Sequence, residues 1–187
     1  MTDEELMAAY AGGDRRSFAL LFQRWAPRIH AFFLRALGEP QAADDLLQVT
    51  FLNVHRARRA FRPLSSLRSW LFSIAAHALH DELRRRKRLP LAPEEQQEAV
   101  AEVVAAEDEQ VSLDSRRRAR EVWAALNHLP ESQRAVLHLH RFEQMSFAEI
   151  AQVLGTTEGA VKLRAFRAYE TLRKRLRGSF HEEGRTA

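Results

Sequence analysis

One stretch near the C-terminus, residues 146–176, constrains the fold of this chain more than any other. Ser146 and Glu149, three residues apart, form a capping box that marks the start of a helix. Apolar residues then recur at i, i+3, i+4 and i+7, namely Phe147, Ile150, Ala151 and Leu154. Gly155 suits the left-handed position that ends a helix, and Thr157 can cap a second one. The pattern predicts two helices joined by a tight turn, a helix-turn-helix.

The second helix of this motif has a packed side and a basic side. At 100° per residue the packed side collects Val161, Ala165, Ala168, Leu172 and Leu176. The opposite side collects Leu163, Phe166, Arg167, Glu170 and Lys174, with Lys162 at its flank. Basic side chains can bond a guanine edge and apolar ones can contact a thymine methyl, so this side suits a helix in the major groove of DNA. The alternative is a solvated basic face with Leu163 and Phe166 buried by other elements.

The charge of the chain is unevenly placed. Residues 89–115 hold eight acids and no Lys or Arg, although the formal net charge of the whole chain is +4. The remaining chain therefore carries 29 bases against 17 acids (25 less 8), a net charge of +12. A basic body favours a polyanion as partner, and the acidic segment is expected to be a linker that is partly helical at most.

The other periodic stretches also predict helices, and none alternates like a strand. They are residues 2–11, 18–37, 41–59, 67–88, 116–129 and 131–142, the second of them interrupted or kinked at Pro27. We therefore expect an all-α protein with two small helical domains joined by an acidic flexible linker, the C-terminal domain being the helix-turn-helix. The expected ranges are 1–88, 89–115 and 116–177, followed by a polar tail, 178–187.

Several classes of function have no support in the sequence. The chain contains no cysteine, which excludes a disulfide framework and a thiolate zinc site. His77 and His80 point into different sectors of one helix, and His138 and His140 lie about 200° apart, so no metal site is expected. We find no nucleophile signature, membrane-spanning run or signal peptide. We expect a cytoplasmic protein that is not an enzyme and uses no cofactor.

Two N-terminal helices carry candidate binding surfaces. Helix 41–59 has an apolar face formed by Leu47, Phe51 and Val54, and a second face formed by Asp45, Val49 and Leu52. Burial on both sides in a bundle and a docking surface for another protein explain this second face equally well. Helix 67–88 ends in the basic run Arg84–Arg88, after a loop that contains Phe61 and with Trp70 nearby. The run is either a solvated helix end or a site for nucleic-acid phosphates, with bases stacked on the aromatic rings.

The order of these pieces resembles the extracytoplasmic-function sigma factors of bacterial RNA polymerase over almost the whole chain. DEELMAAYAGGDRRSFALLFQRW looks like the opening helices of that family, and DDLLQVTFLNVHRA (44–57) resembles its helix that docks on the β′ clamp helices. SLRSWLFSIAAHALHDELRRRKR (66–88) resembles the segment that melts and reads the minus-ten element. LPESQRAVLHLHRFEQMSFAEIAQVLGTTEGAVKLRAFRA (129–168) is similar to the domain that binds the minus-thirty-five element.

The resemblance implies three sets of site residues. Core polymerase docking is assigned to Asp45, Leu46, Gln48, Val49, Phe51 and Leu52. The minus-ten set is Phe61, Arg62, Trp70, His77, His80, Arg84 and Lys87, with Phe61 and Arg62 in the loop that captures a flipped base. The minus-thirty-five set is His140, Arg141, Lys162, Leu163, Arg164, Phe166 and Arg167. Three positions depart from the family pattern: Val49 replaces a usual Glu, His77 a usual Asn, and Leu163 a small polar residue.

The partners implied by the resemblance are RNA polymerase core, through its β′ clamp helices and β flap, promoter DNA and an anti-sigma factor. The anti-sigma factor is expected on the exposed apolar positions, and the acidic linker resembles the segment that threads the product channel. A helix-turn-helix repressor or activator acting as a dimer is the alternative, but the chain has no heptad seam to dimerise through. A helical adaptor that does not bind DNA is a second alternative, which the clustered basic residues disfavour.

Overall fold

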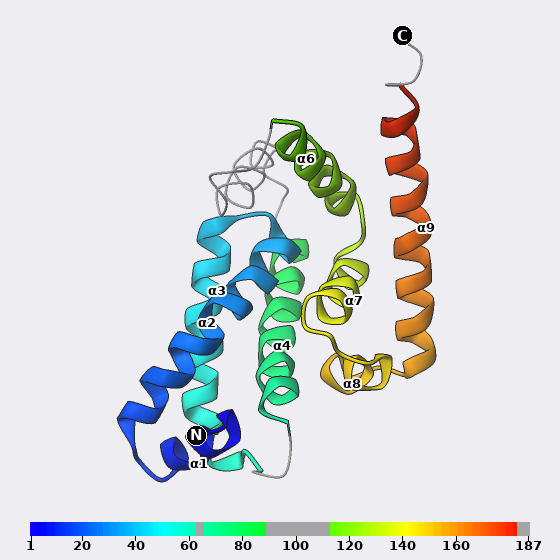
Figure 1. Cartoon of the computed structure of the whole chain (residues 1–187). Coiled ribbons are helices and arrows are strands. Elements are labelled where there is room, and N and C mark those ends of the chain that lie inside the picture. The colour runs from blue at the N-terminus through cyan, green and yellow to red at the C-terminus, as the bar shows by residue number, and fades with distance from the viewer. Residues whose placement is uncertain (63–65, 89–112, 183–187) are drawn as a thin grey trace.

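The structure of the protein, a computed structural model, describes residues 1–62, 66–88 and 113–182, and Figure 1 shows their arrangement. The elements are α1 (Asp3–Ala11), α2 (Arg15–Leu37), α3 (Pro40–Ala57), the short 3-10 helix η1 (Arg58–Ala60), α4 (Leu67–Arg88), α6 (Leu113–Asn127), α7 (Glu131–Arg141), α8 (Phe147–Val153) and α9 (Glu158–Glu182). Every regular element in the described ranges is a helix, so the prediction of an all-α fold is confirmed. The expected acidic linker lies outside these ranges, except for residues 113–115, which lie in α6.

The N-terminal helices, α1 to α4, pack around a core rich in aromatic rings. Phe32 of α2 and Phe72 of α4 are fully buried, with their ring centroids 5.7 Å apart. The first helix begins in a capping box of Thr2 and Glu5. The carboxylate of Glu4 accepts the backbone N–H of Leu67 at 3.1 Å and so ties α1 to the start of α4. Of the two expectations at Pro27, an interruption or a kink, the interruption is wrong, because α2 is one helix from Arg15 to Leu37.

The C-terminal helices, α6 to α9, contain the helix-turn-helix. Ser146 and Glu149 form the capping box at the start of α8, and Gly155 follows it with a φ of 59°. The hydroxyl of Thr157 accepts the backbone N–H of Ala160 at 3.2 Å, and thus caps α9. Helix α9 extends to Glu182, into the range 178–187 that we expected to be a polar tail.

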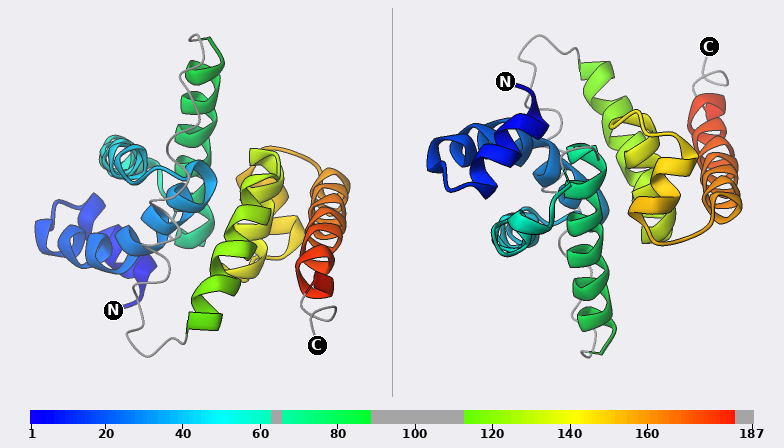
Figure 2. Two further views of the ribbon diagram at one scale, coloured as in Figure 1. Left: turned by 90° about the horizontal axis from the view of Figure 1, so that it is seen from above. Right: turned by 90° about the horizontal axis from the view of Figure 1, so that it is seen from below.

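The two groups of helices lie side by side, as the views from above and below show (Figure 2), and they are in contact. Helix α2 packs against α7, and α4 packs against α8. The rings of Phe32 and Phe72 reach His138 of α7, with centroids 5.2 Å and 6.3 Å away. One hydrophobic core therefore continues from the first group into the second.

Candidate nucleic-acid interface

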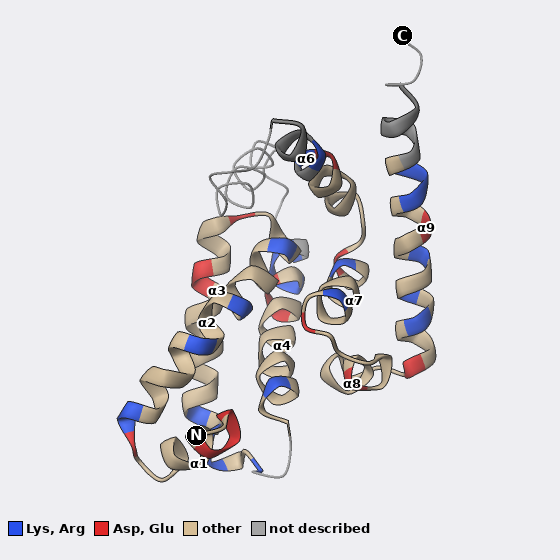
Figure 3. Ribbon diagram, in the orientation of Figure 1, with Lys and Arg blue, Asp and Glu red and all other residues tan. Residues whose placement is uncertain are grey.

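The recognition helix α9 presents the residues expected at a major groove to solvent. Leu163 is 49% exposed and Phe166 is 65% exposed, so the alternative in which other elements bury them is wrong for this structure. Arg167 is also exposed, and Lys162 pairs with Glu158 at 2.7 Å. Lys and Arg positions recur along much of the length of α9 (Figure 3). This face combines positive charge with exposed apolar groups, which is the chemistry of base-edge and methyl contacts.

Two further residues expected at the minus-thirty-five element lie at the end of α7. Arg141 is exposed to solvent. The ring of His140 is stacked 4.6 Å from Phe147, and its Nδ1 lies 2.9 Å from the carbonyl oxygen of Met145. His140 therefore contributes to the packing of the turn before α8, and Arg141 is the more accessible of the two.

The residues expected to dock on polymerase separate into two sets on α3. Asp45, Gln48, Val49 and Leu52 are exposed and fall at i, i+3, i+4 and i+7, so they share one face of the helix. Val49 is 43% exposed and Leu52 is 48% exposed, which contradicts burial of this face inside the bundle. Leu46 and Phe51 are buried, which corrects their assignment as contact residues. The ring of Phe51 lies 4.7 Å from Phe22, a half-exposed side chain of α2 that the sequence reading missed.

The minus-ten set also separates into surface and core residues. Phe61 is only 8% exposed and makes an edge contact with Trp70, with ring centroids 5.3 Å apart. Its assignment to base capture therefore needs correction, because a buried ring offers no face for a base. Arg62 is exposed, and Trp70 is partly buried. The side chain of Lys87 lies outside the described part of the chain.

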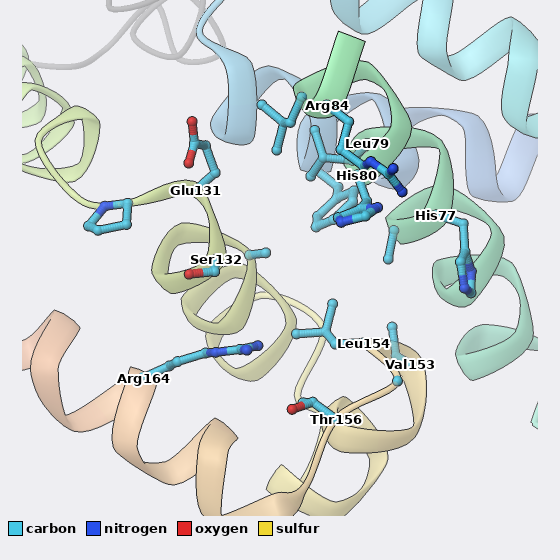
Figure 4. Close-up of a pocket in the computed structure, with 16 residues that line it drawn as sticks. His77, Leu79, His80, Arg84, Glu131, Ser132, Val153, Leu154, Thr156 and Arg164 are labelled. Atoms are coloured by element: carbon cyan, nitrogen blue, oxygen red, sulfur yellow. The ribbon is translucent and has the colours of Figure 1, made fainter. Parts of the chain in front are cut away.

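Three α4 residues of the minus-ten set line a pocket of about 680 Å³ between α4, α7 and the α8–α9 turn. They are His77, His80 and Arg84, and Arg164 of α9 lines the same pocket. His80 and Arg84 face Arg164 across it, with Ser132 and Glu131 of α7 at one side (Figure 4). Nδ1 of His77 is 2.6 Å from the carbonyl oxygen of Ser73, one turn back on α4. The structure thus brings residues expected at two separate DNA elements to one cavity.

A charged contact that the sequence reading missed joins the two groups of helices. Arg28 of α2 donates a hydrogen bond to Glu143, the carboxylate of which is 4% exposed. Arg68 of α4 donates to the carbonyl oxygen of Glu143 at 2.9 Å and to the Glu149 carboxylate at 2.7 Å. His138 lies beside them, 3% exposed, with Nε2 3.6 Å from the Glu143 carboxylate. These pairs span 75 to 115 residues of sequence, so no local signal could have revealed them.

Burial and the neighbouring charges shift the pKa values in this contact. Burial lowers the pKa of His138 below its ordinary value of 6.5, and nearby Arg35 and Arg28 act in the same direction against Glu143. Burial alone would raise the pKa of Glu143, but the nearby imidazole of His138 and the hydrogen bond from Arg28 outweigh it and hold the pKa below 4.5. Backbone and side-chain hydrogen bonds from Ser146, supported by Arg68, lower the pKa of Glu149. In this contact the shifts favour the neutral form of His138 and the charged forms of Glu143 and Glu149.

The described residues contain no group of three or more His, Asp or Glu side chains arranged to hold a metal ion. None of their helices is long and apolar enough to cross a membrane.

Comparison with known proteins identifies the class to which this fold and these surfaces belong. The family model for sigma-70 region 2 matches residues 21–89, and that for sigma-70 region 4 matches residues 119–172. The chain is 35% identical over 170 residues to the RNA polymerase sigma factor CarQ of Myxococcus xanthus, covering 91% of this chain and 95% of CarQ. It is also 35% identical over 175 residues to the ECF RNA polymerase sigma factor SigM of Mycobacterium tuberculosis, covering 94% of this chain and 85% of SigM.

A solved structure extends the likeness to the fold. The structure of CnrH in complex with the cytosolic domain of CnrY matches with a TM-score of 0.68 and 27% identity, over 94% of this chain and 97% of CnrH. The fold and the two matched regions define a sigma factor of the sigma-70 type. The chain belongs to the extracytoplasmic-function sigma factors and functions as an alternative sigma factor, in a family whose members are not enzymes.

Proposed function

We propose that this chain binds RNA polymerase core in the cytoplasm and directs it to promoters by dividing recognition between two domains, 1–88 and 116–177. Residues 89–115 link the two domains, and residues 178–187 follow the second domain. One observation carries the proposal: a region 2 match and a region 4 match lie in the same chain, and each keeps an exposed candidate binding surface. Because the polymerase holds both domains at once, two weak contacts with DNA act together. The chain itself performs no chemical step.

The second domain reads the minus-thirty-five element as duplex. Lys162, Leu163, Phe166 and Arg167 are exposed on α9, and Arg141 is exposed before the turn. Arg and Lys bond guanine edges or phosphates, while Leu163 contacts a thymine methyl. His140 and Arg164 are partly buried, so they lie at the edge of this surface.

The first domain holds the opened minus-ten element. His77, His80 and Arg84 of α4 are exposed, as is Arg62 after η1, and imidazole and guanidinium groups suit contacts with bases and phosphates. Lys87 follows them on the same helix. Phe61 and Trp70 fix the start of α4 beneath this surface, since their rings pack on each other. Imidazole at His77 offers a different donor and acceptor set from the family's amide, so base preference at that pocket differs.

The first domain also docks on polymerase through the exposed face of α3. Val49 and Leu52 supply apolar area between Asp45 and Gln48, which suits a groove between the β′ clamp helices. Leu46 and Phe51 anchor this helix to the core. The second domain contacts the β flap.

An anti-sigma factor is proposed as the regulatory partner. CnrH was solved with the cytosolic domain of CnrY, and a sigma factor RpoE from Bartonella quintana was solved with the anti-sigma factor NepR. Such a partner would bury exposed apolar surface at two places. These are Val49 with Leu52 on α3 and Leu163 with Phe166 on α9.

Run-off transcription tests the proposal directly. Purified core polymerase from the same organism is combined with this protein and a fragmented genomic template. Discrete transcripts that need the protein are expected, and their aligned starts reveal both promoter elements. The absence of transcripts, together with binding of the protein to duplex as a dimer, overturns the proposal in favour of the repressor.

A further inference from the structure

Helix α4 is partly covered by the C-terminal helices in this structure. Its Arg68 is bound by Glu149 and by the carbonyl oxygen of Glu143, and its His80 and Arg84 face Arg164 across the shared pocket (Figure 4). A pocket of about 680 Å³ is the size of a small-molecule site. Because α4, α7 and the α8–α9 turn line this one pocket, DNA that contacts His80 or Arg84 from this side must enter between the two groups of helices.

The acidic partners in this contact come from the C-terminal helices, and the basic ones come from the N-terminal helices. The carboxylate of Glu143 is buried, yet its hydrogen-bonding arginine, Arg28, lies on α2. The guanidinium of Arg68 would be accessible to a phosphate if the two groups of helices were apart, but here it is held by Glu149. The two acids therefore occupy the places that a polyanion would take beside Arg28 and Arg68.

The same contact includes His138, whose ring nitrogens can form more hydrogen bonds when the two groups of helices separate. His138 is buried against Phe32 and Phe72, and neither of its ring nitrogens has a hydrogen-bond partner among the described residues. Water would reach both nitrogens once the halves part. An interface that combines good ion pairs with an unsatisfied imidazole is suited to reversible closure.

We propose that Glu143 and Glu149 keep the molecule closed by holding Arg28 and Arg68, and that these pairs must break before α4 can engage promoter DNA. The contact is thus an autoinhibitory device within the chain, and this role rests on the sigma function proposed above. The closed form and the promoter-bound form compete, so the apparent affinity for polymerase and promoter is the affinity of the open form multiplied by the fraction of molecules that are open.

Spin labels can measure closure without any assumption about function. The chain contains no natural cysteine, so Gln23→Cys on α2 and Gln152→Cys on α8, both exposed, give one labelled pair. Pulsed electron paramagnetic resonance should show one main distance in the otherwise unchanged protein. Arg28→Ala with Arg68→Ala should add a second, longer population. Glu143→Gln should do the same, provided that its circular dichroism shows a folded protein.

Arg24→Ala is the matched control. Arg24 also lies on α2 and pairs with a carboxylate, but its partner is Asp3 at 2.7 Å within the N-terminal helices. Its loss should leave the distance distribution unchanged. Identical distributions in the control and in the Arg28 and Arg68 variant would show that these pairs do not close the molecule, and would overturn the proposal.

Transcription then tests whether closure is inhibitory. With core polymerase and a promoter found by run-off, the Arg28 and Arg68 variant should reach half-maximal activity at a concentration about three- to tenfold lower than the unchanged protein. Opening in the resonance experiment with unchanged half-maximal concentration would refute the inhibitory role while leaving the closed contact intact. Failure of all forms to support transcription would instead refute the sigma function, because the resonance result does not depend on it.

Discussion

Two phenylalanines that the sequence assigned to DNA contact have opposite environments. Phe61 is buried beside Trp70, whereas Phe166 projects from α9 with 65% of its surface exposed. A buried ring contributes to stability through packing, and an exposed ring contributes to binding through its free surface. The residue type alone does not distinguish these roles.

Truncation of each ring should therefore affect different properties. We expect Phe61→Ala to lower the free energy of unfolding by about 3 kcal/mol, in the range for buried aromatic truncations. Phe166→Ala should change it by less than about 0.5 kcal/mol, as is usual for a surface position. Urea unfolding followed by circular dichroism measures both. Equal effects of the two substitutions would mean that Phe61 is not part of the core in solution.

Leu163 should determine preference at a single base pair. It is exposed on the groove face of α9, where an isobutyl group can contact a thymine methyl. Leu163→Ser should weaken the preference for thymine at one minus-thirty-five position by about 1 kcal/mol, the lower end of the usual cost of a mismatch. Promoter selection and sequencing with each protein measures this preference. Tyr169→Ser, at another exposed site on α9, should leave that position unchanged, and an unaltered preference in Leu163→Ser would exclude the contact.

At the scale of the element, α3 shows how one helix serves both core and surface. Leu46 and Phe51 face inward, while Asp45, Gln48, Val49 and Leu52 form a stripe toward solvent. Two exposed apolar side chains in such a stripe are costly to leave in water unless a partner covers them. The stripe therefore has the features of a docking surface.

Charge placed in this stripe should weaken binding to core polymerase. Val49→Asp should raise the dissociation constant at least about tenfold, equivalent to about 1.4 kcal/mol, because a carboxylate replaces buried apolar contact. Val122→Asp on α6 is the matched control, since Val122 is 40% exposed and lies outside the stripe. Fluorescence titration of labelled protein with core polymerase measures both. Equal affinities for the two variants would place the docking surface elsewhere.

At the scale of the whole molecule, the contact between the two groups of helices should depend on pH. Burial lowers the pKa of His138 in the closed molecule, and the open molecule has the ordinary value of 6.5, so the open form binds more protons below that pH. The charged groups around this ring are Arg28 and Arg35 of α2, Glu143 after α7, and Arg68 of α4 beyond it.

Closure should therefore be complete above pH 7 and weaken as the pH falls below 6.5, by at most about 1.4 kcal/mol per pH unit for one proton. The lowered pKa of Glu143 acts in the same direction below pH 4.5. The labelled pair at positions 23 and 152 reports the closed fraction between pH 8 and pH 5.5. His138→Phe should remove this dependence, and a closed fraction that stays constant across the range in the unchanged protein would contradict the expectation.

The sequence by itself determined the helices, because the signals for them are local. The capping box of Ser146 and Glu149, the turn at Gly155 and the apolar period of α9 all act within a few residues, and the structure contains each of them. Order and motif spacing were also enough to indicate the family, which the matches to regions 2 and 4 confirm. Residues 89–112 lie beyond what the structure describes, so the linker is still a prediction.

Only the tertiary structure decided which side chains of those helices are free. Burial of Leu46, Phe51 and Phe61 depends on neighbours from other helices, so the amphipathic pattern of a single helix cannot specify it. Arg28 and Glu143 pair although they are 115 positions apart in the sequence. Arg68 and Glu149, which also pair, are 81 positions apart. Such contacts depend on how folded helices pack against one another, because long-range packing, and not local propensity, brings these charges together.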